Sequence, residues 1–110
     1  MYARIGTFDV PPEQLDQVIS LFQDTVVPAF SKHKGFLRYT AYVSRDRGRI
    51  VGVSCWETLT DLEESGGTGA WAREEAAQRG AQMVGEPQVL ELAFDSPANV
   101  VIEHTIIEQL

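Results

Sequence analysis

The chain has 110 residues, of which 44% are apolar and 23% charged, and its 16 acidic and 9 basic side chains give a formal charge of -7. This length fits one globular domain, and the single cysteine, Cys55, excludes an intramolecular disulfide and a Cys/His zinc cluster. The acidic total disfavours nucleic acid as a partner, and neither a signal peptide nor a membrane-spanning run of about 18 apolar residues is found, so we expect a cytoplasmic protein.

The charge is unevenly distributed along the chain. Residues 32–49 carry six basic side chains against one acidic side chain, a net of +5, while residues 57–110 carry eleven acidic side chains against two arginines, a net of -9. The total of -7 is therefore the difference between two unlike segments.

The first third of the chain is predicted to form a strand and a long amphipathic helix. Residues 2–9 are rich in β-formers, and Pro11 and Pro12 end that strand. Proline is tolerated in the first turn of a helix, and apolar residues then recur at intervals of three or four, as one buried stripe requires. Pro28 and Gly35 are expected to close the helix. The stripe consists of Leu15, Val18, Phe22, Val26 and Phe30.

A hairpin and a short helical turn are predicted next. Residues 36–45 and 50–57 have the composition of strands, and Gly48 between them can adopt the positive φ of a tight turn. Thr60 and Glu63 then match a capping box, in which the threonine oxygen and the glutamate satisfy each other's free backbone N–H groups. A short helical turn should therefore begin at this point.

The last part of the domain is predicted to contain a second helix and a fourth strand. Residues 70–84 are rich in alanine and favour a helix, which Gly85 and Pro87 should stop. The glycines at 66, 67 and 69 favour a flexible junction before it, because they lack the lysine of a phosphate-binding motif. Residues 89–94 alternate between apolar and polar, as a strand does.

The predicted order is β-α-β-β-α-β, which is the ferredoxin-like α+β arrangement of an antiparallel sheet with both helices on one face. The other face would carry Trp56 or Tyr42, depending on register, and an apolar sheet face is rarely left bare. We therefore expect a homodimer with its sheets face to face. In this interpretation residues 1–97 form the domain, and residues 98–110 form an apolar strand or arm that packs on the partner subunit.

Three short motifs accompany this order: Lys34-Gly35-Phe36 at the start of the second strand, Cys55-Trp56-Glu57-Thr58 at the end of the third, and residues 62–65 leading into a helix. Together they resemble the antibiotic biosynthesis monooxygenase family over about residues 2–95. The resemblance implies a dimeric α+β barrel with a cavity between the open sheet face and the helices. It also implies a monooxygenase that oxidises a phenolic, quinol-like or polycyclic aromatic substrate with O2, using no metal or flavin cofactor. The alternative is a non-catalytic small-molecule-binding or stress-related protein of the same fold.

A haem-degrading branch of the family can be tested on the sequence. It is recognised by an asparagine on the first strand, a tryptophan near the second helix and a histidine on that helix. Here the first strand offers Ile5, Gly6 and Thr7, and the chain's one asparagine is Asn99. No histidine lies in residues 70–84, so we do not expect haem degradation.

Oxygenation without a cofactor needs an apolar pocket, a base or hydrogen bond that favours the ionised phenol, and groups that stabilise negative charge. Flat substrates stack on aromatic rings, so the pocket candidates are Trp56, Trp71, Tyr39 and Tyr42. The competing role for Trp56 is that of a core anchor, and for Trp71 it is helix packing. Tyr39 and Tyr42 differ by an odd number of positions, so only one of them can face the pocket.

The polar candidates are few. Histidine is the usual proton acceptor near neutral pH, so His33 joins Trp71 as a candidate catalytic residue, although its two lysine neighbours also fit a solvated loop. Arg38 and Arg73 could hold an anionic group of the substrate, or lie on the surface. Cys55 sits in an apolar strand, which favours a buried thiol, and no metal site is expected.

One motif points toward RNA. The segment from Lys34 to Tyr39 echoes an RNA-recognition signature, and RNA-recognition domains share this order of strands and helices. In those domains the signature lies on the third strand, whereas here it opens the second. The predicted third strand has one aromatic and no basic residue, so we expect no nucleic-acid partner.

Overall fold

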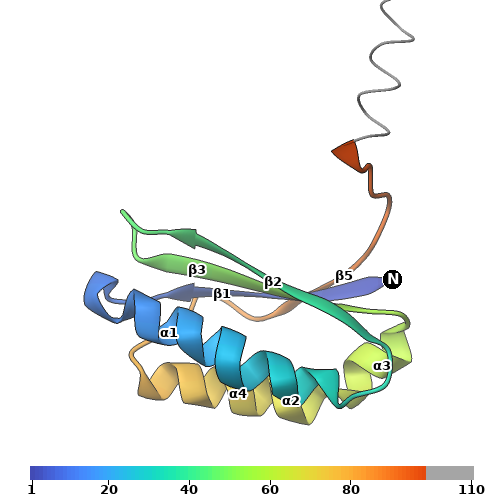
Figure 1. Cartoon of the computed structure of the whole chain (residues 1–110), viewed down its shortest axis with the longest axis horizontal. Coiled ribbons are helices and arrows are strands. Elements are labelled where there is room, and N and C mark those ends of the chain that lie inside the picture. Colours follow the sequence, from blue (N-terminus) through green and yellow to red (C-terminus); the bar gives the residue numbers. More distant parts are fainter. Residues whose placement is uncertain (99–110) are drawn as a thin grey trace, which may run out of the picture.

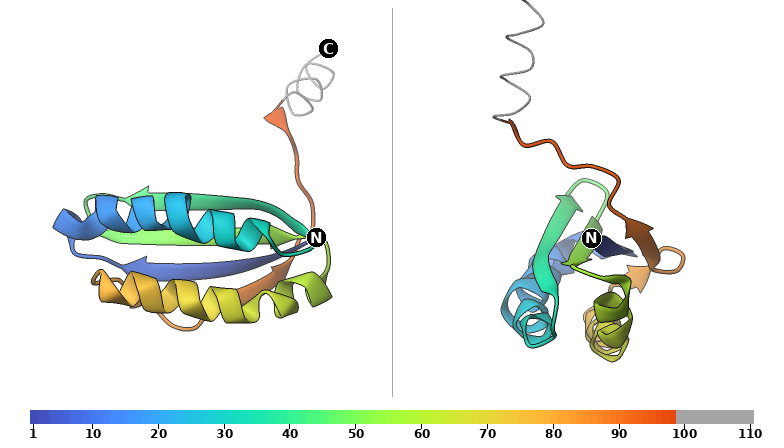
Figure 2. Two further views of the ribbon diagram at one scale, coloured as in Figure 1. Left: turned by 60° about the horizontal axis from the view of Figure 1, so that its bottom comes forward. Right: turned by 90° about the vertical axis from the view of Figure 1, so that its right-hand side faces the viewer.

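The structure, a computed structural model, describes residues 1–98 and contains one antiparallel sheet with helices packed on one of its faces (Figures 1 and 2). The strands are β1 (Tyr2–Asp9), β2 (Phe36–Ser44), β3 (Arg49–Trp56), β4 (Gln82–Met83) and β5 (Gln88–Glu91). The helical segments are η1 (Pro12–Gln14), α1 (Leu15–Leu21), η2 (Phe22–Val26), α2 (Val27–Ser31), α3 (Leu59–Glu64) and α4 (Gly66–Gln78). Among the described residues, no helix is long and apolar enough to span a bilayer.

The strand order confirms the predicted fold class. The sheet runs β2-β3-β1-β4, and β5 pairs with the other end of β1. The fourth strand of the ferredoxin-like order is therefore divided into two short pieces, β4 and β5, along one edge of β1. The end-on view in Figure 2 shows α1 to α2 and α3 to α4 side by side beneath the sheet, which leaves the opposite face uncovered.

The first helix runs where the apolar stripe predicts it, and all five stripe residues are buried. Its middle, η2, is a π-helical turn, in which the N–H of Val27 donates to the carbonyl of Phe22. Pro28 gives the reason, because it has no N–H for the carbonyl of Asp24 and its ring would clash with that carbonyl in a regular α-helix. The helix thus continues through Pro28 to Ser31 instead of ending at the proline.

The second half departs from the sequence-based boundaries. Thr58, not Thr60, caps α3, since the N–H of Asp61 donates to Thr58 Oγ1 at 3.0 Å. The next helix, α4, begins at Gly66 and includes the glycines that were expected to form a junction. It ends at Gln78 rather than at residue 84, because Gly80 adopts a φ of 88° and the N–H of Ala81 returns to the carbonyl of Ala76.

The hairpin of β2 and β3 forms as predicted, and its register determines which side chains share a face of the sheet. Gly48 has a φ of 64°, and Tyr39 lies opposite Ser54 in the ladder between β2 and β3. Ser54 and Trp56 are buried beneath the helices, so Tyr39 lies on the helix-covered face and Tyr42 on the open face, where it is 65% exposed. Of the two alternatives for the open face, Tyr42 is therefore right and Trp56 is wrong.

The described chain ends away from the domain. Residues 92–98 follow β5 and lead away from the sheet, with Phe94 82% exposed (Figure 1). The predicted arm, with Asn99 and His104, lies outside the described residues apart from its first position.

Candidate functional site

A pocket opens between the sheet and the helices because two glycines face each other in it. Gly6 on β1 and Gly52 on β3 are direct partners, and their alternation with buried neighbours places both on the helix-covered face. Without side chains there, the sheet has a bare patch that the helices do not fill. The pocket is lined by Arg4, Gly6, Phe8, Phe22, Val26, Phe30, Tyr39, Gly52, Ser54, Gly69, Ala72, Arg73 and Pro87.

Tyr39 brings a hydroxyl group to the bare patch. Its ring packs between Phe22 and Phe30, with ring centroids 5.9 and 6.1 Å away, and the hydroxyl lies over Gly52. Burial raises the pKa of the Tyr39 hydroxyl far above its ordinary value, so the group stays protonated at neutral pH. It makes no hydrogen bond among residues 1–98, and it can therefore donate to an oxygen atom of a ligand.

Arg4 is fixed at one end of the pocket by α3. Its Nη2 donates to the carbonyl of Leu62 at 2.6 Å, and its Nη1 donates to Ser65 Oγ at 3.1 Å. These bonds place a cation at the C-terminal end of α3, where the helix dipole favours positive charge, although a helix of this length contributes little. Burial, and then the charge of Arg73, lower the pKa of Arg4.

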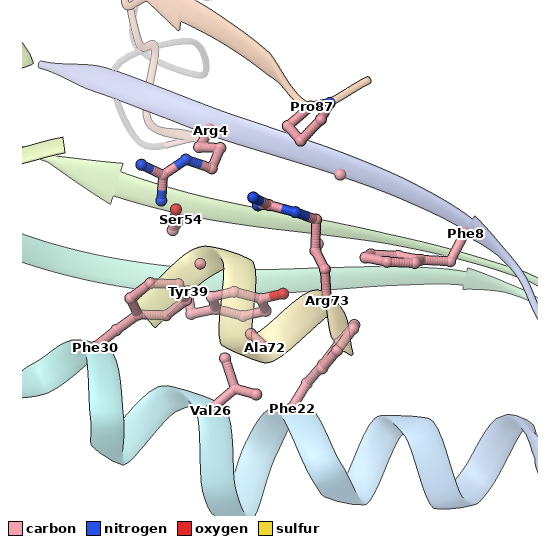
Figure 3. Close-up of a pocket in the computed structure, with 13 residues that line it drawn as sticks. Arg4, Phe8, Phe22, Val26, Phe30, Tyr39, Ser54, Ala72, Arg73 and Pro87 are labelled. Atoms are coloured by element: carbon pink, nitrogen blue, oxygen red, sulfur yellow. The ribbon is translucent and has the colours of Figure 1, made fainter. Parts of the chain in front are cut away.

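Arg73 comes from α4 and reaches the same end of the pocket (Figure 3). Gly69, one turn earlier, makes this approach possible, because a Cβ at Gly69 would lie 3.0 Å from Arg4 Nη1 and 3.3 Å from Arg73 Nη1. The two nitrogens are therefore at most 6.3 Å apart, the sum of those distances. Figure 3 shows both guanidinium groups on the sheet side of the pocket, with the rings of Phe22, Phe30 and Tyr39 opposite.

The pocket is narrow in this state. The space that a water-sized sphere can enter measures about 40 Å³. A cavity that binds benzene measures on the order of 150 Å³. The pocket thus has room for water but not for an aromatic ring, and a ring can enter only when the lining moves. Arg73 and Pro87 are partly exposed, and Pro87 lies in the connection between β4 and β5, so these two residues are placed to open it.

Three of the sequence candidates lie beside the pocket without lining it. Trp56 is 0% exposed, packs edge-on against Phe30 and Phe36, and donates from Nε1 to Ser54 Oγ at 3.0 Å. His33 stands edge-on to Trp56, with its Nε2 2.7 Å from Thr68 Oγ1, and so joins the end of α2 to the start of α4. Trp71 is partly buried and packs against the core.

The remaining candidates are divided between the two faces. Tyr39 and Arg73 line the pocket, whereas Tyr42, Arg38 and Cys55 line a shallow groove on the open face of the sheet. Of the predicted binding residues, the structure thus brings Tyr39 and Arg73 together in one pocket and places Tyr42 and Arg38 on the opposite face of the sheet.

Sequence reasoning missed Arg4, Ser54 and the glycine pair. A signal for Arg4 does exist, because it lies four residues before Phe8 and so shares with it a strand face whose other positions are Tyr2 and Gly6. The glycine pair has no local signal, since the pairing of Gly6 with Gly52 depends on the register of two distant strands. Among residues 1–98, no group of three His, Cys, Asp or Glu side chains is arranged to hold a metal ion.

Comparison with known proteins gives a family match and curated relatives. The sequence profile of the Antibiotic biosynthesis monooxygenase family matches residues 1–82. An uncharacterized protein of Mycobacterium tuberculosis, Rv2558, is 32% identical over 101 residues, which make up 90% of this chain and 43% of that protein. The chain thus spans less than half the length of this relative.

Solved structures share the fold at low sequence identity. A monooxygenase from the gene ActVA-Orf6 of Streptomyces coelicolor, in complex with the ligand nanaomycin D, has a TM-score of 0.62 at 19% identity, covering 88% of this chain and 92% of that one. SnoaB, a cofactor-independent oxygenase from Streptomyces nogalater, has a TM-score of 0.59 at 16% identity, covering 87% and 94%. At these identities the likeness establishes the fold alone.

Proposed function

The chain belongs to the antibiotic biosynthesis monooxygenase family, and from this premise we propose that it oxidises a phenolic, quinol-like or polycyclic aromatic substrate with O2 in the pocket between sheet and helices. The observation that carries the proposal is the pocket lining, in which an aromatic wall faces two guanidinium groups and the neutral hydroxyl of Tyr39. The same fold in an oxygenase and a monooxygenase supports it.

In a reaction of this kind the substrate supplies the electrons. The ionised phenol passes an electron to O2, one oxygen atom enters the substrate as a carbonyl group, and the other leaves as water with two hydrogen atoms of the substrate. The charges of Arg4 and Arg73 favour the ionised phenol and the anionic oxygen species that follows. Tyr39 keeps its proton and donates a hydrogen bond to the phenolate oxygen, while the aromatic wall excludes water. His33 and Trp71 do not line the pocket, and we assign them no step.

The proposal predicts enzyme-dependent oxygen uptake. Metal-free protein should accelerate O2 consumption by at least one member of a panel of anthrones and hydroquinones, measured above the protein-free rate. The variant Gly6→Val fills the bare patch of the sheet and should lower the acceleration at least about tenfold, which corresponds to about 1.4 kcal/mol of transition-state stabilisation. Its added Cβ would lie 3.3 Å from the Phe8 ring, so circular dichroism should accompany the assay to verify folding.

Arg47→Gln, in the exposed turn between β2 and β3, is the matched control and should keep the wild-type rate. A wild-type protein that accelerates no member of the panel would refute the proposal for these substrate classes.

The pocket also supports the second candidate function, a non-catalytic binding protein. Its lining contains no histidine and no carboxylate, so among residues 1–98 no side chain in the pocket is suited to act as a base at neutral pH. A pure binding protein would take up the same aromatic compounds without consuming oxygen. The uptake assay therefore separates the two functions.

The open face of the sheet is the proposed interface of a homodimer. Its groove combines exposed apolar side chains from β2, from β5 and from the residue after β5: Tyr42, Leu90 and Leu92 are 65%, 50% and 44% exposed. A second copy that covers this face would bury them, and a two-fold axis would bring each Tyr42 close to the partner's surface.

Sedimentation equilibrium should therefore give twice the chain mass of 12.2 kDa, and Tyr42→Asp, which places an unpaired charge in the interface, should shift the mass toward 12.2 kDa. Thr25→Asp adds the same charge on an exposed part of the first helix and should leave the mass unchanged. A wild-type mass of 12.2 kDa would contradict the proposed dimer.

A further inference from the structure

Arg4 and Arg73 place two positive charges at one end of the pocket with no anion beside them. Among residues 1–98, neither guanidinium has a carboxylate within 4.0 Å. Of the five other arginines, three lie within 3.1 Å of a carboxylate oxygen: Arg45 with Asp16, Arg49 with Asp9, and Arg79 with Glu75. The other two, Arg38 and Arg47, have no such partner among residues 1–98, but both are exposed to water.

Structural stabilisation alone would favour a carboxylate partner for Arg4, which is the more buried of these cations. A charge withdrawn from water needs a partner more than an exposed one does, because solvation is lost. Arg45 and Arg49 are paired although their side chains are 63% and 41% exposed, while Arg4, which is held in the pocket wall, is left beside a second cation. Two neighbouring cations in the pocket wall therefore favour the binding of an anion from outside the chain.

We propose that Arg4 and Arg73 together bind the carboxylate of an aromatic acid. Binding of the acid depends only on the pocket, whereas its identification as the substrate rests on the proposed function. The aromatic part of the acid follows from the wall of the pocket, where Phe22, Phe30 and Tyr39 offer rings within reach of the two cations.

The separation of the two cations is compatible with one carboxylate. The Nη1 atoms of Arg4 and Arg73 are at most 6.3 Å apart, the sum of their distances from a Cβ at Gly69, so the two oxygens of a carboxylate can each face one guanidinium. Arg4 already donates to Leu62 and Ser65, which holds it in place and leaves other N–H groups for a ligand.

One net positive charge remains after a carboxylate has bound. That charge still favours an ionised phenol on the same ring, and the hydroxyls of Tyr39 and Ser54 lie in the same lining to receive its oxygen. Binding of the acid and ionisation of the phenol are thus compatible within one pocket.

The test uses benzoate and benzamide, which have nearly the same shape and differ in charge, and neither of which is a phenol. Titrations of ¹⁵N-labelled protein, followed by amide chemical shifts, should give benzoate at least about tenfold tighter binding than benzamide, with shifts at Gly6 and Gly69. Arg73→Gln should reduce the preference to within about twofold, and Arg73→Lys, which keeps the charge, should retain most of it. Arg47→Gln is the control for the loss of one surface charge and should keep the full preference.

Equal binding of benzoate and benzamide, or shifts confined to residues away from the pocket, would overturn the inference. Displacement of benzoate by an equal concentration of inorganic phosphate would also overturn the assignment to a carboxylate. If benzoate is preferred through Arg73 but no substrate of the oxygen-uptake panel is oxidised, the carboxylate site stands and the proposed reaction fails.

Discussion

Replacing Trp56 with alanine is expected to lower the free energy of unfolding by about 3–5 kcal/mol, because the indole is the largest side chain that is fully buried. Its ring contacts Phe30, Phe36 and His33 edge-on, and its N–H donates to Ser54. Removing it leaves a cavity where α2, β2 and β3 meet. A domain of this size has a total stability of about 5–15 kcal/mol, so the variant should be close to unfolding.

Urea denaturation followed by circular dichroism measures this effect. Phe94→Ala removes an aromatic side chain that is 82% exposed and should change the free energy of unfolding by no more than about 0.5 kcal/mol. Trp56→Phe keeps most of the packing but loses the hydrogen bond to Ser54, and it should fall between wild type and alanine. A loss below 1 kcal/mol for Trp56→Ala, on the scale of about 3–5 kcal/mol expected for such truncations, would mean that the indole does not anchor the core.

Gly52→Ala is expected to displace Tyr39 from the pocket and to cost about 1–3 kcal/mol of stability, as overpacking does in a dense core. The added Cβ would overlap the Tyr39 hydroxyl and lie 3.0 Å from the ring carbon that bears it. Tyr39 is held between Phe22 and Phe30, so it cannot move aside without disturbing both rings.

A double-mutant cycle tests this contact. Tyr39→Phe removes the overlapping oxygen, so Gly52→Ala should cost less in the Tyr39→Phe background than in the wild type. Gly66→Ala is the matched control, because a Cβ there meets nothing within 4 Å and alanine favours a helix, and it should raise stability by up to about 1 kcal/mol. Additive costs in the cycle would show that Gly52 and Tyr39 are not in contact.

The elements that depend on local pattern could be predicted from the sequence. The first helix was predictable because burial of one stripe imposes its spacing along the whole helix, and the hairpin was predictable because Gly48 alone in that turn can take a positive φ without strain. The residue that caps α3 was harder to predict. Thr58 and Thr60 are both good caps, and only the extended backbone at Thr58, with φ of -131° and ψ of 160°, distinguishes them.

The pocket depends on contacts between residues that are distant in the sequence. For this reason the sequence alone indicated few of the residues that line it. Arg4 contacts the end of α3 through hydrogen bonds to Leu62 and Ser65, which lie 58 and 61 positions later in the sequence. Gly69 was expected to lie in a flexible junction before the second helix, yet it lies within α4, where the absence of a side chain leaves space for two arginines. In both cases tertiary packing overrides the local preference.

The π-helical turn before Pro28 also determines the direction in which the side chains of the first helix point at the pocket. From Val18 onward the stripe advances by four residues at each step, and in an α-helix of 3.6 residues per turn such steps rotate by about 40° each. Phe22 and Phe30 would then point about 80° apart. The wider turn absorbs this rotation, so Phe22, Val26 and Phe30 all face one cavity. Apolar residues thus recur every four positions on both sides of Pro28, and the proline that was expected to close the helix instead aligns its rings.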